Sequence, residues 1–135
     1  INLVEKLNLN IVGLDSCFGE RTFNFRVKNN YKSPLKNLAE AYLNKPACPR
    51  MIEIERRLEE VKKLIKQRKA AGLIYFVPKF CDQASYDFKY LKEWANQNNF
   101  PVLLLEGEYD SGSSGQITTR IEAFRESINY SEIEV

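Results

Sequence analysis

The sequence predicts an α/β domain of the three-layer Rossmann-like (flavodoxin-like) kind, with a mostly parallel sheet between helices. Two uninterrupted apolar runs of strand length, Leu73–Val77 and Pro101–Leu105, alternate with segments in which apolar residues recur every three or four positions. Continuous apolar strands are typical of parallel sheets covered on both faces, and helical connections make right-handed crossovers. The length of 135 residues suits one hydrophobic core, so we expect a single domain over residues 1–135.

The first half of the chain contains one expected strand and two expected helices. Leu9–Leu14 is a short apolar run that ends in turn-forming residues, and it reads as a buried strand. Ser33 and Pro34 suit the first positions of a helix, and Arg50–Ala71 has the clearest helical period, which Gly72 ends. The apolar positions of the two helices are Leu35, Leu38, Ala39, Tyr42 and Leu43, and then Ile54, Leu58, Val61 and Ile65.

The second half alternates more regularly. A helix over Ser85–Asn98 should join the two apolar strands, and a turn over Gly107–Gly115 should precede a last helix over Gln116–Ile128, before a frayed tail from Ser131. The residues expected to face inward on these helices are Phe88, Leu91, Trp94 and Ala95, and then Ile117, Ile121, Phe124 and Ile128.

Composition excludes several classes of site. The chain has no histidine, which removes imidazole metal ligands and histidine-based nucleophile pairs. Its three cysteines, Cys17, Cys48 and Cys81, are odd in number and widely spaced, which argues against a disulfide framework and excludes a complete four-cysteine site in one copy. The net charge of +2 is small, and the basic residues between Lys62 and Lys69 alternate with apolar ones as on a solvated helix face. We expect no nucleic-acid partner.

The apolar runs of the chain are too short to cross a membrane. Charged residues at Glu5 and Lys6 interrupt the N-terminal segment, which therefore does not resemble a signal peptide. We expect no membrane partner and a cytoplasmic protein.

The predicted topology gathers three polar loops. Ligands of open parallel sheets bind beyond the carboxyl ends of the strands, and the loops Asp15–Cys17, Lys79–Asp82 and Glu106–Gly115 should lie at that edge. Cys81 lies between a strand and a helix N-terminus, where backbone N–H groups and nearby Lys79 favour a thiolate. Such a thiolate could be a nucleophile, a redox sensor or a metal ligand, and a buried packing cysteine is the structural alternative. For Cys17 and Cys48 the same alternatives are open: a functional thiol, or a cysteine that only packs.

The glycine- and serine-rich loop Asp110–Gly115 precedes a helix and could offer backbone amides to a phosphate or carboxylate. It lacks the lysine of a Walker motif and does not follow the first strand, as a dinucleotide fingerprint would. An ordinary turn with a helix cap explains such a loop more often than a ligand site does.

A series of short motifs is familiar when taken together. The series comprises Gly13–Cys17, Tyr42-Leu43 followed by Pro46–Arg50, Lys79-Phe80-Cys81-Asp82, Tyr90–Lys92, Pro101–Glu106, Gly115-Gln116 and Thr119–Phe124. In this order and spacing the chain resembles the C-terminal part of subunits of the 2-hydroxyacyl-CoA dehydratase and benzoyl-CoA reductase family. The resemblance runs from about Leu3 to Ile128.

The resemblance implies a function. Family subunits hold a 4Fe–4S cluster with cysteines from more than one domain, and in the dehydratases an ATP-hydrolysing activator delivers the single electron that turns the CoA thioester into a ketyl radical. Cys81 matches the C-terminal cluster cysteine and is the expected metal ligand, while the roles of Cys17 and Cys48 in binding the cofactor stay open. The residues expected around the cluster or substrate are Lys79, Asp82, Gly112, Ser113, Ser114, Gly115, Gln116 and Arg120.

Family subunits are longer and carry further ligands in an N-terminal half. The resemblance therefore implies a C-terminal fragment of a two-domain subunit, inactive alone, whose cluster is absent or incomplete without its partners. Those partners would be the missing N-terminal domain, a homologous second subunit, the activator and a CoA thioester substrate. A cluster-free ligand-binding module and a thiol redox protein of the same fold are the alternatives.

Overall fold

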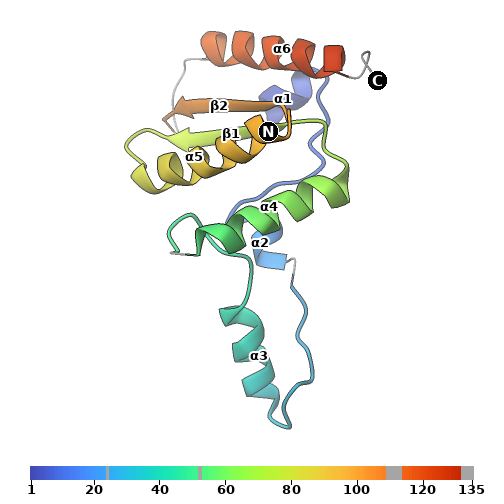
Figure 1. Cartoon of the computed structure of the whole chain (residues 1–135), viewed down its shortest axis with the longest axis vertical. Coiled ribbons are helices and arrows are strands. Elements are labelled where there is room, and N and C mark those ends of the chain that lie inside the picture. Colours follow the sequence, from blue (N-terminus) through green and yellow to red (C-terminus); the bar gives the residue numbers. More distant parts are fainter. Residues whose placement is uncertain (24, 52, 109–113, 132–135) are drawn as a thin grey trace. The chain divides into compact units, whose positions relative to one another are not determined.

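The computed structural model describes residues 1–23, 25–51, 53–108 and 114–131 (Figure 1). Internal contacts divide the chain into two compact units. We call Ile1–Val12 with Lys69–Val135 the sheet unit, and Gly13–Arg68 the helical unit. The expectation of one domain over residues 1–135 stays a prediction.

The sheet unit contains a pair of parallel strands joined by a helix. Its elements are α1 (Asn2–Lys6), β1 (Leu73–Pro78), α5 (Asp82–Gln97), β2 (Val102–Gly107) and α6 (Ser114–Ser131). The register runs from Leu73 opposite Val102 to Pro78 opposite Gly107. The parallel pairing confirms the expectation, because a helix as long as α5 carries the chain back to the start of the next strand.

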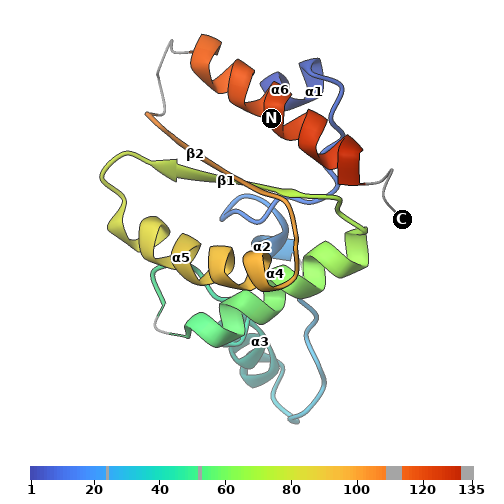
Figure 2. The same cartoon turned by 45° about the horizontal axis from the view of Figure 1, so that its top comes forward.

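Helices lie on both sides of these strands. Figures 1 and 2 show α6 on one side of the β1–β2 pair and α5 on the other. The buried apolar residues of the sheet unit come from β1, β2 and these two helices: Val77, Ala84, Phe88, Leu91, Ala95, Leu105, Ile121 and Phe124. The expected inward face of α5 is thus confirmed at three of its four positions, and the fourth, Trp94, is half-buried with its ring 5.5 Å from that of Phe100.

Close packing explains Gly72 just before β1. A Cβ atom at this position would lie 2.8 Å from Cζ of Phe124 and 2.9 Å from Cδ1 of Ile128, both on α6. The glycine therefore lets α6 approach the chain where β1 begins. On the same helix, the Arg125 guanidinium donates to the Leu7 carbonyl at 3.1 Å, which holds the segment after α1.

The strands are less covered than the sequence suggested. In β1 only Val77 is buried, and Phe76 is 42% exposed. Among the described residues the sheet has two strands, so each strand has one edge without a neighbour. The described residues therefore form an α/β fold with a small parallel sheet. The expected three-layer Rossmann-like arrangement stays a prediction.

The expected strand over Leu9–Leu14 is wrong. The described residues form no strand there, and Ile11, Val12 and Leu14 are each more than a third exposed. The run crosses the division between the two units at Val12 and Gly13, so it does not belong to a single sheet. An apolar run becomes a strand only where a neighbouring strand takes up its backbone hydrogen bonds, and the sequence did not reveal that none does so here.

The helical unit contains α2 (Glu20–Phe23), α3 (Pro34–Leu43) and α4 (Ile54–Arg68). The two expected helices are present, although α4 runs from Ile54 to Arg68 rather than from Arg50 to Ala71. The helix ends before Lys69, whose φ is +51°, so Gly72 does not end it as expected. The apolar positions of α3 are exposed, and the buried residue of this helix is Asn37. Its side chain accepts from the Tyr31 N–H at 2.8 Å and donates to the Tyr31 carbonyl at 2.9 Å, so it replaces a backbone partner for the preceding segment.

None of the helices in the described ranges combines the length and the apolar character that a membrane span requires.

Candidate functional site

Cys81 lies in a tight turn between β1 and α5. The Lys79 N–H donates to the Gly107 carbonyl at 2.9 Å and extends the strand ladder by one bond. The Cys81 N–H then donates back to the Pro78 carbonyl at 3.1 Å, and Cys81 becomes the N-cap residue of α5. Its carbonyl accepts from both the N–H and the Oγ of Ser85, at 3.1 and 3.2 Å. The backbone on both sides of the cysteine is therefore fixed.

The thiol of Cys81 is less constrained than its backbone. The side chain makes no capping hydrogen bond, and Sγ has one weak contact, at 3.8 Å to Oε1 of Gln83. The residue is half-buried and forms no disulfide. Cys81 thus lies at the N-terminus of α5 as a free thiol.

An exposed ion pair lies beside this turn. Nζ of Lys79 is 2.8 Å from Oε1 of Glu108, which follows β2. The hydrogen bond and charge of Glu108 raise the pKa of Lys79, with a smaller contribution from Glu106, and Lys79 in turn lowers the pKa of Glu108. The pair joins the segments that leave the two strands, with side chains 48% and 60% exposed.

The start of α6 contains the remaining expected residues of the sheet unit. Ser114 is the first residue of α6, Gly115 and Gln116 are exposed, and Gly112 and Ser113 lie outside the described residues. Arg120 donates from Nη2 to the Leu104 carbonyl at 2.6 Å. That bond holds α6 against β2.

A buried charge cluster organises the helical unit. Nη2 of Arg57, on α4, lies 2.6 Å from Oδ2 of Asp15, and Nε of Arg21, on α2, lies 2.7 Å from Oδ1 of the same carboxylate. Arg57 also donates to the Ala47 carbonyl at 3.2 Å, and Arg21 to the Asp15 carbonyl at 3.1 Å. The Arg57 side chain is only 6% exposed. We call Asp15, Arg21 and Arg57 the arginine clamp.

Beside the clamp is a cavity of about 20 Å³, whose lining includes Glu20, Arg21 and Glu60. Within the described residues, Nη1 of Arg21 is buried and has no hydrogen-bond partner. A cavity of this size holds about one water molecule, and a water there would accept from that donor.

The arginine clamp ties together the loops that carry the other two cysteines. Asp15 comes two residues before Cys17, and Ala47 comes immediately before Cys48. Cys17 is exposed, Cys48 is half-buried, and both are free thiols. The backbone of each loop is also held locally, because the Cys17 carbonyl accepts from Oγ1 of Thr22 and the Cys48 carbonyl accepts from the Met51 N–H.

The structure thus gathers part of the expected set. Lys79, Cys81 and Asp82 lie at the carboxyl end of β1, with Glu108 from the end of β2 beside them. Cys17 and Cys48 belong to the helical unit. Across the described ranges, no three or more histidine, cysteine, aspartate or glutamate residues are grouped so that they could hold a metal ion.

Sequence reasoning missed the arginine clamp. Arg57 lies three residues after Ile54 and four before Val61, so it occupies the apolar stripe of α4. A charged residue in an apolar stripe signals a buried ion pair, and this signal was available. The identity of its partner, Asp15, could not be read from the sequence, because the two residues are 42 positions apart.

Comparison with known proteins identifies relatives over nearly the whole chain. The family model described as 2-hydroxyglutaryl-CoA dehydratase, D-component, matches residues 1–128. The (R)-phenyllactyl-CoA dehydratase beta subunit of Clostridium sporogenes is 28% identical over 128 residues, which cover 95% of this chain and 34% of the relative. The beta subunit of (R)-2-hydroxyglutaryl-CoA dehydratase from Acidaminococcus fermentans is 33% identical over 72 residues, or 53% of this chain and 19% of that relative. The chain spans about a third or less of the relatives it matches.

Proposed function

The chain belongs to the 2-hydroxyglutaryl-CoA dehydratase D-component family, and from that premise we propose that it supplies one cluster cysteine, Cys81, to a dehydratase acting on a 2-hydroxyacyl-CoA. The resemblance expected from the motifs is confirmed at the level of the family. The cluster and the radical chemistry are our proposal. Both relatives are named as beta subunits, which supports a role within a larger assembly.

The observation that carries the proposal is the setting of Cys81. Its backbone is fixed at a strand end and a helix N-terminus, while its sulfur has, among the described residues, only the weak contact with Gln83. A ligand on a fixed backbone with an uncommitted sulfur can bond to iron without loss of a structural contact. Fe–S clusters are held by cysteine thiolates, and Cys81 has the chemistry and partial exposure that such a ligand requires.

The sheet unit supplies one cysteine ligand, Cys81, and contains no second cysteine. The described residues hold no ready group of metal ligands, so the other thiolates must come from outside this unit. Cys17 and Cys48 are available as free thiols in the helical unit, and further cysteines would come from the parts of the subunit that this chain does not cover. When bound, the cluster would pass a single electron to the CoA thioester.

The residues around Cys81 would then tune and shield the site. The Lys79–Glu108 pair places one cation and one anion at the strand ends, next in sequence to the turn that carries Cys81, without a net charge. Arg120 holds the start of α6 against β2 and so acts as a positioning residue for Gly115 and Gln116. Asp82, exposed in the first turn of α5, is free to face a partner or the substrate.

Partners and compartment follow from the same chemistry. We include in the proposal an N-terminal domain, a homologous second subunit and an ATP-dependent activator that donates the electron. Three free cysteines and a thiolate-bound cluster suit a reducing compartment, so we propose the cytoplasm. We also propose that further strands extend the β1–β2 pair in the complete subunit, so that the sheet is the middle layer of a three-layer α/β fold.

The test is Cys81→Ser in the complete subunit after anaerobic reconstitution. Serine keeps the volume but offers a harder oxygen donor, so we expect iron per subunit, the electron paramagnetic resonance signal of the reduced cluster and turnover to fall together. Cys17→Ser and Cys48→Ser, run in parallel, assign the other two thiols. Full iron and full activity in Cys81→Ser would refute the assignment and leave a cluster-free binding module or a thiol redox protein.

A further inference from the structure

A groove of about 360 Å³ lies in the helical unit, between α3 and the segment that precedes it. A volume of this order is typical of a small-molecule site. The side chains that line the groove come from both walls: Phe25, Arg26, Lys28 and Asn30 from the preceding segment, and Asn37, Glu40, Ala41 and Asn44 from α3 and its C-cap. We call this the basic groove. None of these residues belongs to the expected site around Cys81.

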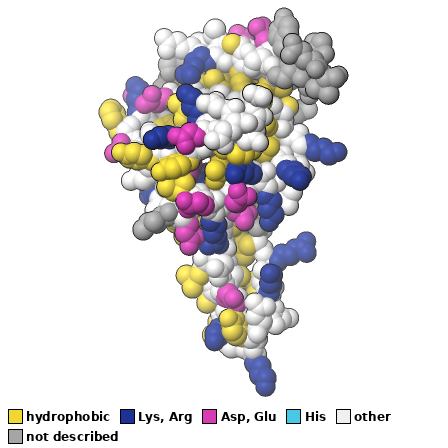
Figure 3. Space-filling model, viewed as in Figure 1, with side chains coloured by type: hydrophobic (Ala, Val, Ile, Leu, Met, Phe, Trp, Pro, Cys, Tyr) yellow, Lys and Arg dark blue, Asp and Glu magenta, His cyan; other side chains and the backbone are white. Residues whose placement is uncertain are grey.

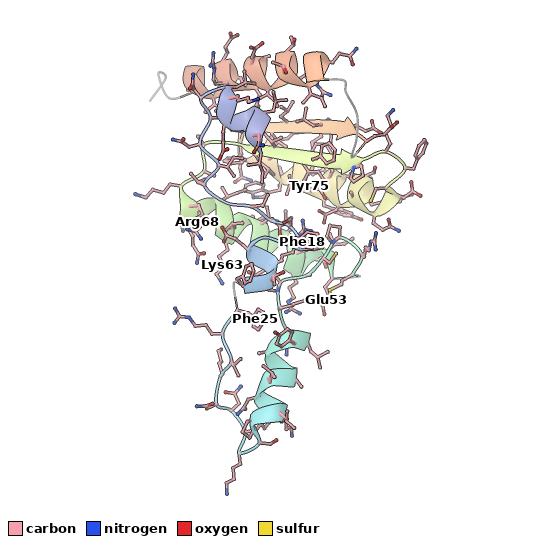
Figure 4. The ribbon with its side chains drawn as sticks, turned by 180° about the vertical axis from the view of Figure 1, so that it is seen from behind. Phe18, Phe25, Glu53, Lys63, Arg68 and Tyr75 are labelled. Atoms are coloured by element: carbon pink, nitrogen blue, oxygen red, sulfur yellow. The ribbon has the colours of Figure 1, made fainter. Side chains whose placement is uncertain are left out.

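The two walls of the basic groove are joined near both of its ends. Toward the start of α3, Asn37 accepts from the Tyr31 N–H at 2.8 Å and donates to the Tyr31 carbonyl at 2.9 Å. Toward the end of α3, the centroids of the Phe25 and Tyr42 rings lie 5.0 Å apart in an edge-to-face contact, and Figure 4 shows Phe25 beside α3. The groove is therefore formed without a ligand, as sites for small molecules usually are.

Positive charge is concentrated around this groove. Residues 25–45 contain one glutamate and five basic residues, which are Arg26, Lys28, Lys32, Lys36 and Lys45. Their net charge is +4, whereas the whole chain has +2, so the rest of the chain is negative. Figure 3 shows Lys and Arg side chains projecting around α3, where Asp and Glu side chains are few. This asymmetry of charge favours an anionic ligand at this part of the chain.

Two of these cations are free to bind a ligand. Arg26 and Lys28 are exposed in the lining of the groove, and among the described residues their side chains make no hydrogen bond or ion pair. Lys36, by contrast, lies over the Tyr31 ring, 4.3 Å from its centre. Guanidinium and ammonium groups are the usual protein partners of a phosphate. The two unpartnered cations therefore indicate a ligand that carries phosphate.

The other side chains of the lining favour a nucleotide over a bare phosphate. Phe25 contributes an aromatic ring, against which a purine base can stack. The half-buried Glu40 carboxylate accepts a long hydrogen bond, of 3.4 Å, from Nδ2 of Asn30, and it has capacity left for a ribose hydroxyl or an exocyclic amino group. An inorganic phosphate would use neither group, and the carboxylate would repel it. The lining therefore suits the base, the sugar and the phosphate of a nucleotide together.

We propose that the basic groove binds the phosphorylated nucleotide end of a CoA thioester. The choice of CoA rests on the proposed function, and CoA carries phosphate groups on both the 3′ and the 5′ oxygen of its ribose. Arg26 and Lys28 bind the phosphates. Phe25 stacks on the adenine, and Glu40 accepts from the ribose or from the adenine amino group. Binding the end of a substrate that does not react supplies energy for placing the end that does.

A nucleic acid is the other polyanion that a basic surface attracts. Its affinity comes from many phosphate contacts along an extended strand. Here the basic residues are confined to one short stretch, and the remainder of the chain is negative, so an extended polyanion would meet repulsion beyond the groove. A single nucleotide fits the distribution of charge better.

The experiment measures the binding of adenosine 3′,5′-bisphosphate, the nucleotide end of CoA, to the complete iron-free subunit by isothermal titration calorimetry. We expect Arg26→Gln and Lys28→Gln each to weaken binding about fivefold, and the two together about twentyfold. Lys63→Gln is the matched control, because it removes an exposed cation of the same unit, on α4, that does not line the groove (Figure 4). Its affinity should equal that of the unmodified subunit. All variants should keep the thermal midpoint, because among the described residues these three side chains have no hydrogen-bond or ion-pair partner to lose.

Further ligands separate the possible sources of the phosphate. Inorganic phosphate should bind about tenfold or more weakly than the bisphosphate, because it lacks the base. A single-stranded oligoadenylate should bind no more tightly than the bisphosphate does. Raising the concentration of KCl should weaken binding of the bisphosphate to the unmodified subunit, which tests the role of charge without any substitution.

The inference is overturned if the bisphosphate does not bind, or if it binds equally to Arg26→Gln, Lys28→Gln and Lys63→Gln. Tighter binding of the oligoadenylate would replace it with a nucleic-acid surface, and equal binding of inorganic phosphate would replace it with a simple anion site. None of these measurements uses iron. If Cys81→Ser keeps its iron, the proposed function fails, and the calorimetry still decides whether the basic groove binds this nucleotide.

Discussion

Replacement of Arg57 by methionine tests whether the arginine clamp holds the helical unit together. Methionine keeps an unbranched stem of similar length but removes the guanidinium, which donates to Asp15 at 2.6 Å and to the Ala47 carbonyl at 3.2 Å. The Arg57 side chain is 6% exposed and Ala47 is 1% exposed, so water does not readily replace either bond.

The magnitude follows from these two losses. An unsatisfied carbonyl at Ala47 costs about 1 to 2 kcal/mol. The Asp15 carboxylate is 22% exposed and keeps Arg21 as a partner, so its share stays at the lower end of the cost of breaking a buried ion pair. We expect Arg57→Met to lower the free energy of unfolding of the helical unit by about 4 to 5 kcal/mol.

The assay is native-state hydrogen exchange followed by mass spectrometry, because peptides from α4 report on the helical unit alone. Arg56→Met is the control. Arg56 is the adjacent residue and is half-buried, but its partner Glu53 and the Asn44 and Lys45 carbonyls to which it also donates are exposed to water, so its loss should cost about 1 to 2 kcal/mol. Asp15→Asn completes a double-mutant cycle with Arg57→Met, with an expected coupling of about 1 to 3 kcal/mol. If Arg57→Met costs no more than Arg56→Met, the reasoning is wrong.

Two further predictions use other contacts. Asn37→Ala removes both hydrogen bonds to the backbone of Tyr31, which is itself 40% exposed. Hydrogen exchange in residues 25–44 should therefore indicate a free energy of local opening that is lower by about 1 to 2 kcal/mol. Unchanged exchange there would contradict the structural role of Asn37. Lys79→Met should return the lowered pKa of Glu108 toward its ordinary value of 4.5, as measured by carbon-13 NMR titration of the carboxyl group. Because the folded pKa of Glu108 is lowered, the stabilisation it receives is present above pH 4.5 and is lost as the pH falls through the folded value. The raised pKa of Lys79 means that its own contribution is present below pH 10.5 and is lost as the pH rises through the folded value. A Glu108 pKa that is the same with and without Lys79 would disprove the pairing.

The sheet unit was largely predictable from local pattern. Leu73–Val77 and Pro101–Leu105 are apolar throughout, and the segment between them has a clear helical period, so a parallel pair with a helical crossover followed directly. The same reasoning located Cys81 at the junction of β1 and α5, where the structure has it. The family, too, was evident from the spacing of the short motifs.

The helices α3 and α4 were predictable in the same way, but the segment that leads into the helical unit and the buried face of α3 were not. The run Leu9–Leu14 has the composition of a strand but lacks a neighbour, and the apolar positions of α3 face solvent while Asn37 is buried. Period and composition describe what a segment could bury, whereas burial itself depends on what lies against it. Nothing local to Leu9–Leu14 or to α3 contains that information.

The sequence by itself determined the elements from β1 to α6, the parallel direction of β1 and β2, and the place of Cys81 at a helix N-terminus, because each follows from residues near one another in the chain. Only the tertiary structure decided that Arg57 joins Asp15 to Ala47 and that Phe80 is held at positive φ with its ring in solvent. The arginine clamp depends on contact across 42 residues, and the Phe80 turn on a strand ladder that fixes the backbone before it. Long-range contacts and backbone strain both arise only when the chain folds, so neither can be read from the residues of one short segment.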